Sequence, residues 1–167
     1  MRKLIAVSML ALAACASEPA TAPSADMAAS AEPAAVTWNT LTGEPPIVIA
    51  HRGASGLYPE HTMMAYETAI AQGADFIEPD LVMTSDGVLI ARHDIYLSET
   101  TDIADHPEFA DRKTVRETPF GEQEDWWVDD FTYAEIMTLK ARQQFEGRPM
   151  EYNDTLDIVT FDEVMDL

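Results

Sequence analysis

The sequence has few basic residues, a single cysteine and no internal repeat. Lysine and arginine together number 10 against 30 aspartates and glutamates, which gives a formal net charge of −20. A nucleic-acid-binding protein needs a basic surface to neutralise phosphates, so this charge balance argues against that class. A lone cysteine, Cys15, cannot form an internal disulfide bond. The acidity fits a soluble exported protein or one that requires a divalent cation.

The first fifteen residues offer an explanation for the cysteine. Arg2 and Lys3 are followed by an apolar stretch at 4–12, and Leu-Ala-Ala-Cys ends the segment at Cys15. The stretch is shorter than the roughly 20 residues of a transmembrane helix, and small residues before the cysteine suit signal cleavage. The tetrapeptide resembles a bacterial lipobox, which predicts a lipoprotein signal peptide at 1–14 and a lipidated Cys15. The alternative is an ordinary secretory signal with an incidental cysteine.

The segment after the cysteine differs in composition from the rest of the chain. Residues 15–45 are rich in Ala, Ser, Thr, Pro and Glu and have no apolar periodicity. Such a segment buries too little apolar surface to offset the entropy of ordering, so we expect a disordered tether. Residues 46–167 are predicted to be the folded domain. The protein is therefore expected to be exported to the periplasm, outer membrane or cell surface and anchored there by lipid.

Short apolar runs and helix-start signals follow one another along this domain. Continuous apolar runs are typical of parallel strands that are covered on both faces. We expect strands at 47–50, 74–80 and 88–91, and helices that start at Thr62, Thr132 and Thr160. Residues 95–131 are acidic and rich in turn formers, so no regular element is expected there. The order of elements indicates an α/β fold with a mainly parallel sheet.

Ionisable side chains follow each predicted strand, and loops at the carboxyl ends of parallel strands converge on one opening. They are His51 with Arg52, Glu78 with Asp80, and His93 with Asp94. Two carboxylates that are two residues apart in a strand point to the same side, where they repel each other unless a cation neutralises them. Oxygen ligands suit Ca²⁺ or Mg²⁺ better than zinc. Glu78 and Asp80 are therefore candidate metal ligands; the alternative is a solvated edge strand with alternating acids.

Two histidines at equivalent strand ends are candidates for a general acid and a general base. His51 and His93 flank the carboxylate pair, and an imidazole titrates near neutral pH. A lone histidine is more often structural, and we expect His61 and His106 to be structural or exposed. Arg52 carries a planar charged fork that suits a phosphate.

Four motifs occur in order along the domain. They read His51-Arg52-Gly53, Pro59-Glu60-His61-Thr62, Glu78-Pro79-Asp80 and His93-Asp94. Together they resemble the signature series of the glycerophosphodiester phosphodiesterase family, most closely its periplasmic bacterial branch, over residues 47–167. The resemblance implies a phosphodiesterase-type TIM (β/α)8 barrel, incomplete here, with about its first three strands and their helices present. It also implies a divalent metal, Ca²⁺ or Mg²⁺, and hydrolysis of glycerophosphodiesters to sn-glycerol 3-phosphate and an alcohol.

The resemblance assigns roles by motif position. It makes His51 and His93 the acid and base, Glu78 and Asp80 the metal ligands, and Arg52 a phosphate contact. The expected partner is a small-molecule substrate, with no nucleic acid and no evident protein partner. Two departures stand out: the family's Glu-x-Lys segment, which carries a third metal carboxylate, does not occur in this sequence, and Glu99 stands where many relatives carry arginine.

Two other interpretations fit parts of the sequence. One is a related phosphodiesterase of phospholipase C or D type that acts on intact lipids, but the acidic insertion lacks the apolar or basic surface that lipid binding needs. The other is a catalytically inactive truncated lipoprotein. The absence of the third carboxylate favours that interpretation, whereas the presence of both histidines and both acids argues against it.

Overall fold

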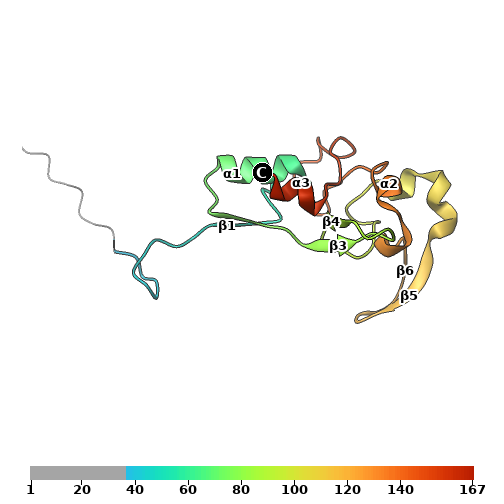
Figure 1. Ribbon diagram of the computed structural model, residues 1–167, viewed down its shortest axis with the longest axis horizontal. Helices are drawn as coiled ribbons and strands as arrows, with labels where there is room; N and C mark the ends of the chain where they lie inside the picture. Colours follow the sequence, from blue (N-terminus) through green and yellow to red (C-terminus); the bar gives the residue numbers. More distant parts are fainter. Residues whose placement is uncertain (1–36) are drawn as a thin grey trace, which may run out of the picture. The chain divides into compact units, whose positions relative to one another are not determined.

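The computed structural model describes residues 37–167 (Figure 1). The predicted signal peptide and Cys15 lie outside the described residues, as does most of the predicted tether, residues 15–45. The first element of regular structure begins at Ile49, close to the predicted start of the domain. None of the helices in the described part has the length and apolar character that crossing a membrane requires.

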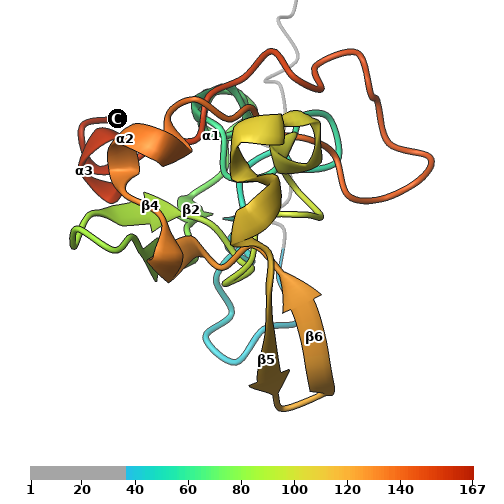
Figure 2. The same ribbon diagram turned by 90° about the vertical axis from the view of Figure 1, so that its right-hand side faces the viewer.

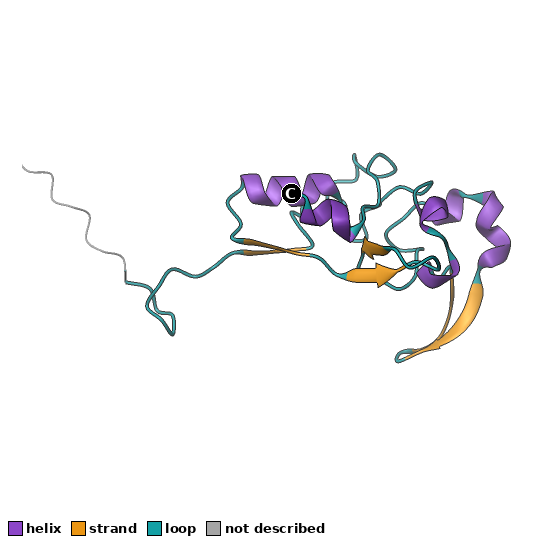
Figure 3. Cartoon of the chain, in the orientation of Figure 1, coloured by secondary structure: helices purple, strands orange, loops and turns teal. Residues whose placement is uncertain are grey.

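The elements between residues 37 and 167 are short and joined by long loops (Figure 3). The α-helices are α1 (Met63–Ala71), α2 (Tyr133–Ile136) and α3 (Phe161–Met165). The strands are β1 (Ile49–His51), β2 (Phe76–Glu78), β3 (Leu81–Met83), β4 (Leu89–Ala91), β5 (Thr114–Thr118) and β6 (Gly121–Asp125). Short 3-10 helices are η1 (Ile103–Asp105), η2 (Pro107–Arg112) and η3 (Val128–Asp130).

Strand pairing differs from the expected mainly parallel sheet. β1 pairs with β2 in parallel, whereas β3 pairs with β4, and β5 with β6, in antiparallel hairpins. The predicted strand 74–80 is shorter than expected, because β2 ends at Glu78 and the chain continues through Pro79 into β3. Proline lacks the N–H that a sheet ladder needs. Asp80 therefore lies beyond β2, so the premise that Glu78 and Asp80 belong to one strand is wrong.

The predicted helix starts are confirmed. Thr62 caps α1, its hydroxyl accepting from the Ala65 N–H at 3.3 Å, and the helix is followed by Gly73 at φ +87°. Thr132 and Thr160 each form a complete capping box with the glutamate three residues later. A threonine hydroxyl satisfies backbone N–H groups that have no partner in the first helical turn, which is why these positions start helices.

The largest buried cluster lies in the segment that was expected to be irregular and the residues around it. Residues 95–131 form the β5–β6 hairpin, which projects from the rest of the domain in Figure 2. Next to it, Trp126 and Trp127 are buried, and their indole N–H groups donate to the carbonyls of Phe109 at 2.7 Å and Thr114 at 2.9 Å. The tryptophans therefore pack this segment, and the expectation of no regular element is wrong.

The first strands are not covered on both faces. Ile49 is 55 % exposed and Phe76 58 % exposed, while Ala65, Tyr66 and Ala69 of α1 are buried. A strand is buried on both faces only when elements lie against each of them. Within residues 37–167, β2 packs against α1. The main contacts of β1 with other elements of regular structure are those with β2. The expectation of two-sided burial is therefore wrong for this segment.

Candidate active site

The parallel pairing of β1 with β2 brings the first and third motifs together. His51 lies opposite Glu78 in the register. The next backbone N–H, that of Arg52, donates to the Glu78 carbonyl at 3.0 Å and approaches the carboxylate oxygen Oε2 at 3.3 Å. Both strands thus end at the same edge, with a histidine and a carboxylate side by side, as the sequence predicts.

The Arg52 side chain is held by two carboxylates. Its Nη1 donates to both oxygens of Glu60, at 3.1 and 3.0 Å, and its Nε lies 3.3 Å from Asp80 Oδ2. The side chain is only 14 % exposed, and the backbone adopts φ +61°, which non-glycine residues rarely do. A strained backbone persists where surrounding contacts enforce it, often at functional sites. Glu60 therefore braces Arg52, and much of the arginine's charge is already offset.

A buried histidine links Asp80 to helix α1. His61 Nδ1 lies 2.7 Å from the Tyr66 hydroxyl and Nε2 lies 3.3 Å from Asp80 Oδ2. Burial, outweighing the attraction of Asp80, lowers the pKa of His61 to about 4, so the ring is neutral at neutral pH. Since an ionised carboxylate only accepts, Nε2–H donates to Asp80 and Nδ1 accepts from Tyr66. His61 is therefore buried rather than exposed, and it orients Asp80.

Three carboxylates gather around the Tyr66 hydroxyl. Burial raises the pKa of Tyr66, and the negative charges of Glu78, Asp80 and Glu60 raise it further. The phenol therefore stays protonated and keeps donating to His61. The contacts of Arg52 with Glu60, Glu78 and Asp80 bring these three carboxylates together, although the sequence predicted only Glu78 and Asp80 as ligands.

Arg92, which sequence reasoning missed, connects Asp80 to the fourth motif. Its backbone N–H donates to the Asp80 carbonyl at 2.9 Å. Its buried guanidinium donates to the carbonyls of Asp94 at 3.1 Å and Tyr96 at 2.7 Å. Burial lowers the pKa of Arg92 to about 10, so it remains charged and fixes the turn after His93. The signal in the sequence was an arginine directly after the apolar run at 88–91.

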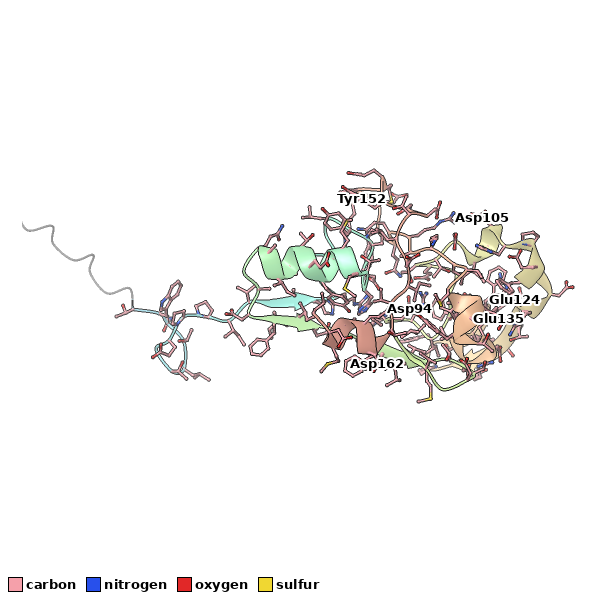
Figure 4. All side chains as sticks on the ribbon, turned by 45° about the horizontal axis from the view of Figure 1, so that its top comes forward. Asp94, Asp105, Glu124, Glu135, Tyr152 and Asp162 are labelled. Atoms are coloured by element: carbon pink, nitrogen blue, oxygen red, sulfur yellow. The ribbon has the colours of Figure 1, made fainter. Side chains whose placement is uncertain are left out.

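His93 is half-exposed and oriented by its neighbour. Its Nδ1 lies 2.7 Å from Asp94 Oδ1, and its side chain is 48 % exposed. Figure 4 places Asp94 in the middle of the domain, apart from Glu124 and Glu135. The contact between Nδ1 and Asp94 fixes the orientation of the His93 ring. Within the described chain, no hydrogen bond or ion pair joins His93 to His51, and His93 does not line the hollow that His51 borders.

A hollow of ≈ 190 Å³ lies at the end of β1. His51, Arg52, Ser55 and Glu60 line one side, and Phe145 and Arg148 line the other. Phe145 and Arg148 come from a loop that carries no motif, so they could not be predicted as site residues from the sequence. Their placement depends on tertiary contacts alone.

The carboxylates fit a hard divalent cation in chemistry. Glu78 and Asp80 supply oxygen ligands of the kind that Ca²⁺ and Mg²⁺ prefer. No group of three or more potential ligands is assembled within residues 37–167, and Asp80 Oδ2 already faces Arg52 and His61. The remaining oxygens of the two acids are those that suit a metal ion.

Gly53 allows the loop after β1 to lie against helix α1. It adopts φ +79°, and a Cβ there would lie 2.7 Å from the Ala65 carbonyl carbon. We expect Gly53→Ala to lower the free energy of unfolding by about 2 kcal/mol or more, because both the backbone angle and the contact are unfavourable. Gly56→Ala, with no atom within 4 Å of its Cβ, should stay within about 1 kcal/mol of the parent. Urea unfolding of both variants is the measurement, and equal stabilities would contradict the close contact.

Comparison with known proteins agrees with the motif positions. Residues 51–167 match the model of the glycerophosphoryl diester phosphodiesterase family. The chain is 45 % identical over 131 residues to glycerophosphodiester phosphodiesterase GDPD6 of Arabidopsis thaliana, covering 78 % of this chain and 35 % of the relative. It is 39 % identical over 137 residues to the glycerophosphodiester phosphodiesterase of Bacillus subtilis, covering 80 % and 40 %.

Solved structures of the same family are similar to this chain. The chain superposes on a glycerophosphodiester phosphodiesterase from Agrobacterium tumefaciens with a TM-score of 0.53 and 28 % identity, covering 73 % of this chain and 42 % of that one. An Oleispira antarctica phosphodiesterase, solved with its product sn-glycerol-3-phosphate, gives a TM-score of 0.51 and 30 % identity, covering 72 % and 39 %.

The chain spans well under half the length of these relatives. The structural neighbours are TIM-barrel enzymes, and the parallel β1–β2 pair with α1 is consistent with an incomplete barrel, as the resemblance implies. The match begins at His51, the first residue of the site, and runs through all four motifs. This chain therefore belongs to the glycerophosphoryl diester phosphodiesterase family.

Proposed function

We propose that the protein hydrolyses glycerophosphodiesters to sn-glycerol 3-phosphate and an alcohol. The observation that carries the proposal is the meeting of His51, Arg52, Glu78 and Asp80 at the ends of β1 and β2. The Oleispira antarctica phosphodiesterase, whose structure contains sn-glycerol-3-phosphate, lends support as a relative. Because the chain covers only part of its relatives, the activity is proposed for the full-length gene product.

The proposed chemistry uses the two histidines as proton carriers. One imidazole removes a proton from the nucleophile, which is water or the glycerol 2-hydroxyl, as the nucleophile's oxygen bonds to phosphorus. Attack by water gives sn-glycerol 3-phosphate directly, whereas attack by the 2-hydroxyl gives a cyclic phosphate that a water molecule must then open. The other gives a proton to the alcohol oxygen as its bond to phosphorus breaks. His93, held at Nδ1 by Asp94, presents Nε2 for this task. His51 borders the hollow next to Arg52.

Glu78 and Asp80 are the proposed holders of a divalent cation, Ca²⁺ or Mg²⁺. Such a cation supplies charge that stabilises negative oxygens on phosphorus. The chain's own contribution is to fix the two acids: the Arg52 N–H approaches Glu78, and His61 and Arg52 approach Asp80. Arg52 in turn is proposed to face the phosphate with the edge not held by Glu60.

The substrate class is tested by a panel of phosphodiesters. Full-length protein is incubated with glycerophosphocholine, glycerophosphoethanolamine, phosphatidylinositol and sphingomyelin, and sn-glycerol 3-phosphate and lipid products are quantified. We expect sn-glycerol 3-phosphate from the first two only. Cleavage of the intact lipids instead would favour a lipid-acting phosphodiesterase, and no cleavage of any substrate would favour an inactive protein.

The N-terminal segment is proposed to anchor the protein outside the cytoplasm. The proposal rests on the lipobox-like Leu-Ala-Ala-Cys15 sequence, with residues 1–14 as the signal peptide and 15–45 as the tether to the domain at 46–167. We expect Cys15→Ser to move the protein from the membrane fraction to the soluble periplasmic or extracellular fraction. Fractionation followed by immunoblotting is the measurement, and a variant that stays with the membrane would reject lipidation at this residue.

A further inference from the structure

A loop distant in sequence forms the second wall of the hollow at His51. Residues 143–150 are attached to the loop after β1 at two points. The buried Gln143 side chain donates to the carbonyls of Ser55 at 3.0 Å and Tyr58 at 2.7 Å. Arg148 Nη1 also donates to the Ser55 carbonyl, at 3.0 Å. These bonds hold Arg148 at the hollow rather than leaving it in solvent.

The two guanidinium groups that line the hollow differ in their partners. Arg52 is engaged by the carboxylates of Glu60 and Asp80. Arg148, by contrast, has no carboxylate at ion-pair distance within the described chain; its contacts are the Ser55 carbonyl and the ring of Phe145, 4.6 Å from the guanidinium carbon. Arg148 therefore carries the positive charge in the hollow that no described acid offsets.

We propose that Arg148 binds the phosphate group of the substrate and of the product. The inference rests on the proposed function and names a second phosphate-binding arginine for the same site. A guanidinium donates through a planar fork that matches phosphate oxygens, and contact with an aromatic ring limits its freedom. Only one of its N–H groups has an acceptor among residues 37–167. Arg148 thus adds phosphate affinity to that of Arg52, whose side chain also holds Glu60 and Asp80 in place.

The test compares three variants of the full-length protein. Binding of sn-glycerol 3-phosphate is measured by calorimetry, and kcat and KM are measured with glycerophosphocholine. We expect Arg148→Gln to weaken product binding about tenfold and to raise KM by a similar factor, with kcat within about threefold of the parent. Arg148→Lys, which keeps the charge but loses the fork, should fall between. Arg116→Gln is the matched control, because it removes the same charge from the β5–β6 hairpin.

The outcomes separate this inference from the proposed function. If Arg148→Gln binds sn-glycerol 3-phosphate as tightly as the parent does, the inference is overturned. Hydrolysis of glycerophosphocholine by the parent would still support the proposed function. A parent that binds sn-glycerol 3-phosphate but releases none from glycerophosphocholine would contradict the function, and the binding comparison would still decide the role of Arg148. A parent that does not bind sn-glycerol 3-phosphate, or an equal loss in Arg116→Gln, would also overturn the inference. If Arg148→Gln does not fold, the test rests on Arg148→Lys. Binding of sn-glycerol 3-phosphate and a KM equal to those of the parent in Arg148→Lys would overturn the inference.

Discussion

His51→Ala and His93→Ala are each expected to lower kcat for glycerophosphocholine about 100-fold or more, the typical loss when a general acid or base is removed. Both residues are exposed, and neither belongs to a buried apolar cluster. Folding should therefore be retained, which circular dichroism and thermal unfolding check. The kinetics are measured as release of sn-glycerol 3-phosphate by the full-length protein.

His106→Ala is the matched control for this experiment. His106 lies near Asp102, at 3.3 Å, and Glu108, at 3.0 Å, and does not line the hollow. It should keep turnover within about twofold of the parent. Turnover close to that of the parent in either His51→Ala or His93→Ala would reject the pairing of these two residues as acid and base.

Asp80→Asn is expected to weaken divalent-cation binding by about 100-fold or more. Substituting a residue that only supports a metal ligand costs about 10- to 100-fold in affinity, and the loss of a charged oxygen ligand should cost at least as much. Isothermal titration calorimetry with Ca²⁺ and Mg²⁺ measures the effect. The substitution also removes the charge that Arg52 and His61 face, so thermal unfolding is recorded alongside.

Asp111→Asn provides the control, because Asp111 is exposed and makes no ion pair in the part of the chain that the structure describes. It should bind cations as the parent does. If the double variant Glu78→Gln with Asp80→Asn also binds like the parent, the two acids are structural and the metal-site proposal fails.

The local signals in the sequence predicted local structure well. Thr62, Thr132 and Thr160 start helices because a threonine hydroxyl meets a backbone N–H within its own turn, an interaction that sequence neighbours determine. The order of motifs also placed His51 opposite Glu78 at one sheet edge, since parallel strands expose their carboxyl ends together. The family followed from the same motifs.

One failure was local: Pro79 ends β2 after Glu78, so Asp80 reaches Arg52 and His61 from beyond the strand. The other failures have a physical cause in contacts between distant segments. The fold of residues 95–131 depends on buried tryptophans whose partners are distant in sequence. Arg148 reaches the hollow through bonds to Ser55, which is 93 residues earlier. No spacing rule in a single sequence encodes such contacts.

One measurement tests the central claim most directly. Full-length protein is stripped of metal with a chelator, then assayed for sn-glycerol 3-phosphate release from glycerophosphocholine before and after Ca²⁺ or Mg²⁺ is restored. The account predicts that release stops on stripping, returns with the cation, and does not return in Asp80→Asn. Release that continues in the stripped protein, or that the restored cation returns equally to Asp80→Asn, would contradict a metal-assisted phosphodiesterase built on Glu78 and Asp80.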